Sequence, residues 1–115
     1  MQIRKTYLGI NAGLLYDEIT DFVKKQGGIL TESKLANYSM PTDSSSHIAR
    51  GTLIFKSDEA GDKEILRVHV IGSPKTEVKL MIDIDEKLFP AEKVATLIGD
   101  LGFVFSSYEK ENQQD

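Results

Sequence analysis

The chain has 115 residues, of which 40% are hydrophobic and 28% are charged, and its formal net charge is −4. This length supports a single hydrophobic core, and the composition excludes wholesale disorder, which requires low hydrophobicity and a high net charge. The negative charge disfavours non-specific binding to nucleic acid or to anionic lipid. Cysteine is absent, which excludes thiolate catalysis and thiolate metal sites and favours a reducing compartment.

The beginning of the chain shows no targeting pattern. Residues 1–7 contain basic side chains but no apolar stretch behind them, so we expect no signal peptide. No apolar run is long enough to cross a bilayer. We therefore expect a cytoplasmic protein with one domain over residues 1–109 and a polar, disordered tail over residues 110–115.

Two segments have the periodicity of amphipathic helices. Over residues 14–25 the apolar side chains that recur at helical spacing are Leu15, Ile19, Phe22 and Val23. Gly27 and Gly28 predict the end of this helix. A second helix is predicted from Pro90, a favoured first residue, to Leu101, with Gly102 as its end. Its apolar stripe consists of Val94, Leu97, Ile98 and Leu101.

Three further segments alternate as strands do and predict an antiparallel meander. Residues 48–56 and 64–71 form the first two strands, joined by a polar loop over residues 57–63. A hairpin turn over residues 72–75 leads to the third strand, residues 77–85. In this last strand the apolar positions are Val78, Leu80, Ile82 and Ile84.

The remaining segments complete the fold prediction. Residues 3–10 are expected to open the sheet and residues 103–108 to close it, while residues 29–38 form a strand that leads into a polar loop over residues 40–46. We therefore predict an α+β fold, an antiparallel sheet of about five to six strands with two amphipathic helices on one face. This order of elements resembles the ferredoxin-like arrangement with an added hairpin, and equally a single repeat of the saddle-shaped TATA-binding proteins. No motif links the chain to either family.

Few residues stand in patterns that catalysis or metal binding requires. Asp83 and Asp85 share a strand face and have the spacing for a Mg²⁺ or Ca²⁺ site or an acid–base pair, but such pairs are also common on solvated strands. His69 has no second histidine at ligand spacing, because His47 is distant in sequence. The serines at 44–46 form no dyad with His47, since neighbours in an extended segment point in opposite directions. We predict no catalytic residue, metal ligand or cofactor, and we favour a protein without enzymatic activity.

If both helices cover one face of the sheet, the opposite face is left open. The alternation assigns to this face Ile65, Arg67, His69, Ile71, Lys79, Met81 and Asp83. The strand over residues 48–56 adds Arg50, Thr52 and Ile54 if Leu53 and Phe55 point inward; in the alternative phase Ile48 and Ile54 belong to the core. Exposed aliphatic residues bordered by charge are typical of contact surfaces. Our candidate binding residues are therefore Arg50, Ile54, Ile65, Arg67, His69, Ile71, Lys79 and Met81.

Three functions compete for this surface. The one we favour is a non-catalytic protein-interaction module that binds a second copy of itself, through sheet faces or edges, or another protein. It predicts that a charge at Met81 or Ile71 yields a monomer.

The two alternatives use other chemistry. A nucleic-acid-binding module would place Arg50, Arg67 and Lys79 on phosphates, but the net charge and the lack of aromatic residues on this face disfavour it. A small-molecule-binding domain, or a small enzyme, would hold its ligand between the sheet and the helices and involve His69 or Asp83.

Overall fold

The computed structural model describes residues 1–40, 43–57, 61, 63–72 and 77–109, with residues 39–40 and 43–47 described by their backbone. Within this part of the chain the elements are β1 (Gln2–Leu8), α1 (Ala12–Lys25), β2 (Ile29–Met40), β3 (Asp43–Lys56), β4 (Glu64–Gly72), β5 (Glu77–Ile84), α2 (Ala91–Phe105) and the 3-10 helix η2 (Ser106–Tyr108). The predicted tail over residues 110–115, and most of the predicted loop over residues 57–63 and turn over residues 72–75, lie outside the described residues.

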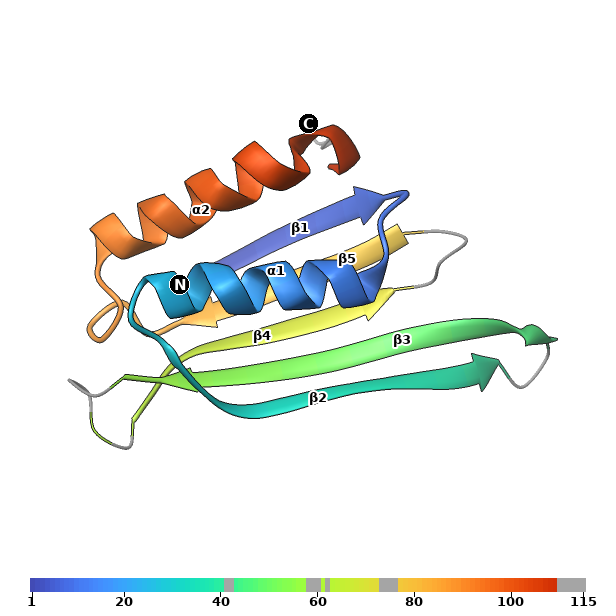
Figure 1. The fold of residues 1–115 in the computed structure, drawn as a ribbon, viewed down its shortest axis with the longest axis horizontal. Coiled ribbons are helices and arrows are strands. Elements are labelled where there is room, and N and C mark those ends of the chain that lie inside the picture. Colours follow the sequence, from blue (N-terminus) through green and yellow to red (C-terminus); the bar gives the residue numbers. More distant parts are fainter. Residues whose placement is uncertain (41–42, 58–60, 62, 73–76, 110–115) are drawn as a thin grey trace.

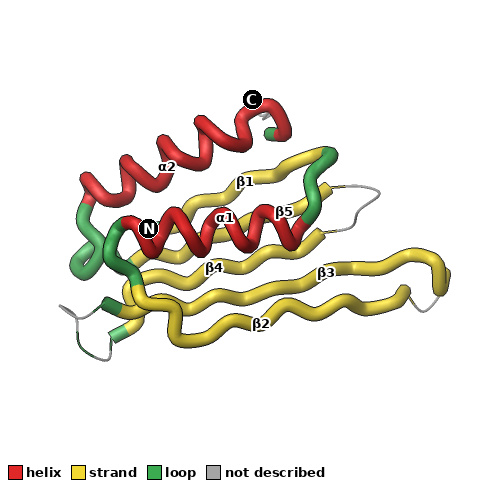
Figure 2. The backbone as a smooth tube through the Cα atoms, viewed as in Figure 1, coloured by secondary structure: helices red, strands yellow, loops and turns green. Residues whose placement is uncertain are grey.

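The five strands form one sheet in the order β1-β5-β4-β3-β2, and every neighbouring pair is antiparallel. Both helices lie on the same side of this sheet, so the domain has two layers (Figures 1 and 2). The predicted α+β class, the meander of β3, β4 and β5, and the two helices on one face are confirmed. Among the described residues, no helix has both the length and the apolar character needed to cross a membrane.

Local signals account for the bounds of α1. The side chain of Asn11 accepts hydrogen bonds from the backbone N–H groups of Gly13 and Leu14, which would otherwise lack partners at a helix start. At the other end Gly27 has a φ of 93°, a left-handed conformation that glycine adopts without a steric penalty. The N–H of Gly28 then donates to the carbonyl of Val23, which closes a Schellman motif and confirms the predicted end of this helix.

The C-terminal helix is longer than its sequence predicts. Gly102 does not end α2, which continues to Phe105 and is followed by η2. The predicted strand over residues 103–108 is therefore wrong. The extra turn forms because the helical path brings Phe105, only 1% exposed, into the core against the rings of Tyr7 and Phe22. Helix propensity at a glycine costs about 1 kcal/mol, which is less than the burial of an aromatic ring contributes.

The β2–β3 hairpin is also longer than predicted. Its ladder continues past the pair Tyr38–Ile48 to Ser39–His47 and, after a register shift, to Met40–Asp43. The prediction of a loop over residues 40–46 is therefore wrong for Met40 and for residues 43–46, whose backbone lies in strands. The added pairs give backbone groups on both strands partners across the hairpin, which backbone N–H and C=O groups away from water require.

The core lies between the helices and the sheet, and it fixes the phase of each strand. Leu53 and Phe55 are fully buried whereas Ile54 is partly exposed, so the first of the two predicted phases for β3 is correct. Ile65, predicted on the open face, is instead buried at 2% exposure, and that prediction is wrong. The register shift between Phe55 and Lys56 interrupts the alternation at the start of β4, so Ile65 and the next residue are both buried.

Candidate functional site

We refer to the side of the sheet that faces away from the helices as the open face. Residues directly opposite each other on antiparallel strands project to the same side of a sheet, so the register arranges the open-face side chains in rows that run from β1 to β2. The Asp83 row contains Gln2, Asp83, Arg67, Ile54 and Glu32. The Met81 row contains Arg4, Met81, His69, Thr52 and Lys34. The Lys79 row contains Thr6, Lys79, Ile71, Arg50 and Ala36.

These rows bring together most of the residues that the alternation assigns to the open face. Apart from Ile65, every candidate binding residue takes a place in one of them: Arg50, Ile54, Arg67, His69, Ile71, Lys79 and Met81. Members that lie far apart in sequence become direct neighbours, as His69 and Met81 do. The fold therefore gathers these candidate residues on one face of the sheet, in three neighbouring rows.

The edge strands add residues that the sequence pattern missed. Arg4 and Thr6 come from β1. The alternation of β1 is obscured in the sequence because Lys5, a charged residue, lies among the apolar residues of the helix-facing side, where its Nζ pairs with Oε1 of Glu109 at 2.8 Å. Lys34 comes from β2, where a register shift between Leu30 and Glu32 breaks the alternation. The same strand brings Tyr38, 55% exposed, to the end of the open face.

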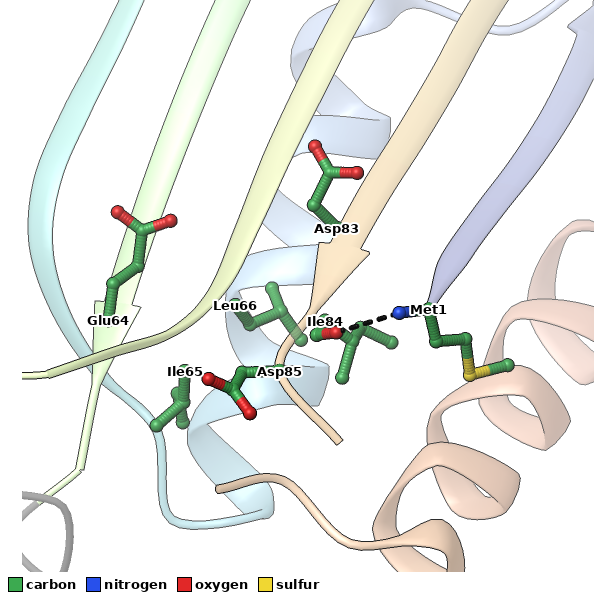
Figure 3. A pocket seen from close by; sticks show the side chains of 7 residues that line it. All are labelled: Met1, Glu64, Ile65, Leu66, Asp83, Ile84 and Asp85. Atoms are coloured by element: carbon green, nitrogen blue, oxygen red, sulfur yellow. Dashed lines mark hydrogen bonds between the residues drawn. The ribbon is translucent and has the colours of Figure 1, made fainter. Parts of the chain in front are cut away.

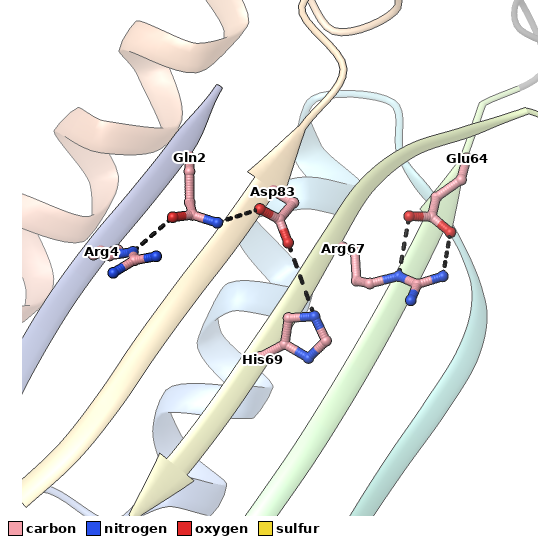
Figure 4. A network of polar contacts seen from close by, with 6 residues as sticks. All are labelled: Gln2, Arg4, Glu64, Arg67, His69 and Asp83. Atoms are coloured by element: carbon pink, nitrogen blue, oxygen red, sulfur yellow. Dashed lines mark hydrogen bonds and ion pairs between the residues drawn. The ribbon is translucent and has the colours of Figure 1, made fainter.

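A chain of polar contacts ties β1, β5 and β4 together on the open face (Figure 4). Nε of Arg4 donates to Oε1 of Gln2 at 2.6 Å, and Nε2 of Gln2 donates to Oδ1 of Asp83 at 2.7 Å. Across the next strand, Nε2 of His69 lies 3.9 Å from the other carboxylate oxygen, Oδ2 of Asp83. Asp83 thus contacts Gln2 of β1 on one side and His69 of β4 on the other.

Arg67 has a partner of its own on this face. Its guanidinium donates from Nε and Nη2 to the two carboxylate oxygens of Glu64, at 3.1 and 2.8 Å. These hydrogen bonds, with the negative charge of Glu64, raise the pKa of Arg67 above its ordinary value. Because its charge is already matched, Arg67 is a weaker candidate for binding a ligand than its sequence position suggests.

A shallow hollow of about 410 Å³ lies on the open face over β1, β5 and β4. The hollow combines apolar atoms from Met81 and Ile71 with cationic or polar groups from neighbouring positions. Ile71 is 41% exposed, which is high for an isoleucine in a central strand. The lining consists of Arg4, Lys5, Thr6, His69, Ile71, Lys79, Leu80 and Met81.

Charge is unevenly distributed over the open face. The Met81 and Lys79 rows contain no carboxylate, and their cations are Arg4, Lys34, Arg50 and Lys79. The carboxylates stand to either side, with Asp83 and Glu32 in the adjacent row and Glu77 two residues before Lys79. The centre of the open face is therefore a cationic band around an apolar hollow.

The acidic end of the sheet forms a separate hollow of about 340 Å³, where β1 begins and β5 ends (Figure 3). Its lining includes the carboxylates of Glu64, Asp83 and Asp85, and the backbone nitrogen of Met1 donates to the carbonyl of Ile84 at 3.0 Å. Within the described part of the chain, no three histidine or carboxylate side chains are grouped closely enough to hold a metal ion. The metal site that Asp83 and Asp85 could form, which the sequence disfavours, thus gains no further ligand among the described residues.

The helix side of the sheet offers a smaller space. A hollow of about 150 Å³ lies beside the N-terminus of α1, lined by Asn11, Ala12, Gly13, Leu35, Asn37, Ala49, Gly72 and Val78. His69 and Asp83 lie on the opposite side of the sheet. They therefore do not line this hollow, although a small-molecule site between the sheet and the helices was expected to involve them.

These observations define the class of the protein: a two-layer α+β domain whose antiparallel sheet carries helices on one face and a cationic, partly apolar surface on the other. Comparison of the chain with family models, with curated proteins and with solved structures returned no match.

Proposed function

We propose that the chain is a non-catalytic protein-interaction module that binds an acidic segment of another protein on its open face. The observation that carries this proposal is the apolar hollow of about 410 Å³ inside a cationic band, on a sheet face that no element of the described chain covers. Exposed apolar surface bordered by charge is typical of protein-binding sites.

The hollow supplies the site for an anchor residue. Affinity in protein interfaces is concentrated in a few apolar or aromatic side chains that enter pockets near the centre of the contact. Met81 of β5 and Ile71 of β4 provide adaptable and exposed aliphatic surface for such a side chain, and each of these two strands is held by a neighbouring strand on both sides. The pocket is thus preformed, which reduces the entropy lost on binding.

The cations supply the preference for acidic residues. Arg4 contacts only the neutral amide of Gln2 among its described partners, and Lys79 has Glu77 at 3.9 Å with its own side chain 69% exposed. An exposed ion pair of this kind contributes at most about 1 kcal/mol and exchanges readily for another carboxylate. Carboxylates of a partner that flank its apolar anchor would be attracted to this band and would fix its orientation.

A protein fits this surface better than a nucleic acid does. The carboxylates of Glu32, Asp83 and Glu77 border the cationic band on both sides and would repel a continuous phosphate backbone laid across the face. Tyr38 adds an aromatic ring for base stacking, but it stands at the end of β2, away from the hollow. A short acidic segment avoids those carboxylates because its charge is local.

The proposal is tested by selecting peptides from a random display library on the wild-type chain and counter-selecting on the Ile71→Asp variant. We expect the retained peptides to combine Asp or Glu with a large apolar residue, and their Kd to rise at least about tenfold with Ile71→Asp and with Met81→Asp. Ile98→Asp is the matched control, because Ile98 is 39% exposed and Ile71 is 41% exposed but Ile98 lies on α2. That variant should bind as the wild type does.

Two results would contradict the proposal. One is a set of selected peptides that bind Ile71→Asp and Met81→Asp as tightly as the wild type. The other is binding of a random DNA or RNA pool that weakens with salt and is lost in Arg50→Gln, which would assign the open face to nucleic acid.

A further inference from the structure

The outer edge of β2 is a second surface of the fold with a definite chemistry. β2 is the terminal strand of the sheet, and among the described residues it pairs only with β3. At 12 residues it is longer than β1, the strand at the other edge, which has 7. A terminal strand presents a row of backbone N–H and C=O groups that can pair with another strand.

The two edges of the sheet differ in how they are protected. At the β1 edge, Tyr7 forms an isolated antiparallel bridge with Glu109, and Lys5 makes an ion pair with the same Glu109 at 2.8 Å. The segment that follows α2 therefore occupies part of that edge. No described residue does the same for β2, so the β2 edge is the one left for an external strand.

The middle of β2 is regular and held in place. The register shift lies between Leu30 and Glu32, and from the pair Glu32–Ile54 onward the ladder pairs each residue in turn to Ser39–His47. The three residues centred on Ser33 therefore belong to the regular part of the strand. Oγ of Ser33 lies 2.6 Å from the hydroxyl of Tyr16, which attaches the centre of the strand to α1. An edge strand that is already ordered loses little entropy when it pairs.

Charged residues on an edge strand normally prevent pairing, and β2 carries two of them on the open face, Glu32 and Lys34. Because they are two residues apart and opposite in charge, this pair is complementary to the same pair on a second copy of the strand. In an antiparallel pair of identical strands with the two-fold axis at Ser33, Glu32 stands opposite the second copy's Lys34, and Lys34 stands opposite the second copy's Glu32. Both charges are then matched, and opposite charges directly across a strand pair stabilise it.

We propose that two copies of the chain associate through antiparallel pairing of their β2 strands in this register, which makes one continuous sheet from both copies. The occupant of the edge is thus a second copy, chosen by the charge complementarity of Glu32 and Lys34. This inference does not rest on the proposed function of the open face. It adds that the open faces of the two copies would lie side by side, so that a partner with two acidic segments would bind more tightly than one with a single segment.

The experiment measures the dimer Kd by sedimentation at concentrations up to roughly 100 μM, a range suited to a contact of this small size. Glu32→Lys places lysines opposite lysines, and Lys34→Glu places glutamates opposite glutamates. Each single variant should raise the dimer Kd by about tenfold. The double variant with both changes restores opposite charges and should dimerise as the wild type does.

A mixture provides the sharpest readout. The two single variants, which repel themselves, should form a mixed dimer when combined, because every opposed pair then has unlike charges. A monomeric wild type at the highest concentration would overturn the proposal, as would a dimer that is indifferent to both charge reversals. If Met81→Asp and Ile71→Asp dissociate the dimer while the charge reversals do not, the copies pair through their open faces instead. Peptide binding at the open face is measured separately, so failure of one proposal is distinguishable from failure of the other.

Discussion

The rings of Tyr7 and Phe105 contact each other between the sheet and α2, with their centroids 5.7 Å apart and their planes inclined at 58°. Tyr7 belongs to the first strand and Phe105 to the last turn of the last helix, so the contact joins the two ends of the described fold. Phe22 of α1 completes the cluster, with its ring 6.3 Å from that of Phe105 in an edge-to-face arrangement. Phe105 is therefore the residue that docks the C-terminal turn of α2.

The first prediction compares two phenylalanines of that turn. Phe105→Ala should lower the free energy of unfolding by about 3–5 kcal/mol, because it removes a ring that is 1% exposed and leaves a cavity beside Tyr7. Phe103→Ala should change it by less than about 0.5 kcal/mol, since Phe103 is 91% exposed. Urea denaturation followed by circular dichroism measures both. Equal effects of the two substitutions would show that α2 ends at Gly102, as the sequence alone predicts.

The second prediction concerns a close approach between α1 and the sheet. A methyl group at Gly51 would lie 2.8 Å from Cε2 of Tyr16 and 2.9 Å from Cδ1 of Leu35, so Gly51→Ala should destabilise the domain by about 1–3 kcal/mol. Gly99→Ala is the control: it lies on the exposed side of α2 with nothing within 4 Å, and it should stabilise the helix by about 0.5–1 kcal/mol. Thermal unfolding of the wild type and the two variants measures their order of stability, which should be Gly99→Ala, wild type, Gly51→Ala. A Gly51→Ala protein as stable as the wild type would mean that the helix can move outward without cost.

The elements with an uninterrupted period were predictable from the sequence. β5 alternates strictly, and its apolar side chains are all buried: Val78, Leu80, Ile82 and Ile84. The apolar stripe of α1 and its end at Gly27 were equally predictable, because the residues there are either buried at helical spacing or form the C-terminal cap. Where burial and local propensity agree, the sequence pattern and the structure coincide.

The errors have a common physical origin in tertiary contacts. Gly102 is a local stop signal, yet burial of Phe105 one turn later outweighs it. At Ile65 and in β2, register shifts change which residue faces the core, and no local pattern reports them. The candidate site depends on the same information, since Arg4 and Lys34 join the open face only once the strand order is known.

The third prediction tests the start of α1. Asn11→Ala removes the acceptor for the N–H groups of Gly13 and Leu14 and should cost about 1 kcal/mol of stability. Asn11→Asp and Asn11→Ser keep a side-chain oxygen at the same place and should lie within a few tenths of a kcal/mol of the wild type. Chemical denaturation of the four proteins measures the differences. If Asn11→Ser is as unstable as Asn11→Ala, the cap does not contribute through its side-chain oxygen.

The last prediction concerns alkaline pH and the hydroxyl of Tyr7. Burial raises the pKa of Tyr7 well above its ordinary value, and the negative charge of Glu109 adds to the increase. Above a pH of about 10 the unfolded chain loses this proton while the folded chain keeps it, so the unfolded state is increasingly favoured as pH rises. The stabilising effect of the protonated hydroxyl is thus complete below pH of about 10 and is lost above it.

Tyr7→Phe has no proton to lose, and its stability should therefore fall less than that of the wild type between pH of about 9 and about 11. The greatest difference in slope is about 1.4 kcal/mol for each pH unit, which urea denaturation at a series of pH values resolves. Tyr38→Phe is the matched control, because it removes a tyrosine hydroxyl from a side chain that is 55% exposed on the open face, away from the cluster around Tyr7. If the stability of the wild type and of Tyr7→Phe falls equally with pH, the Tyr7 hydroxyl has the same pKa in the folded and unfolded states. In that case the contact between Tyr7 and Phe105 would not keep water and hydroxide from this end of the sheet.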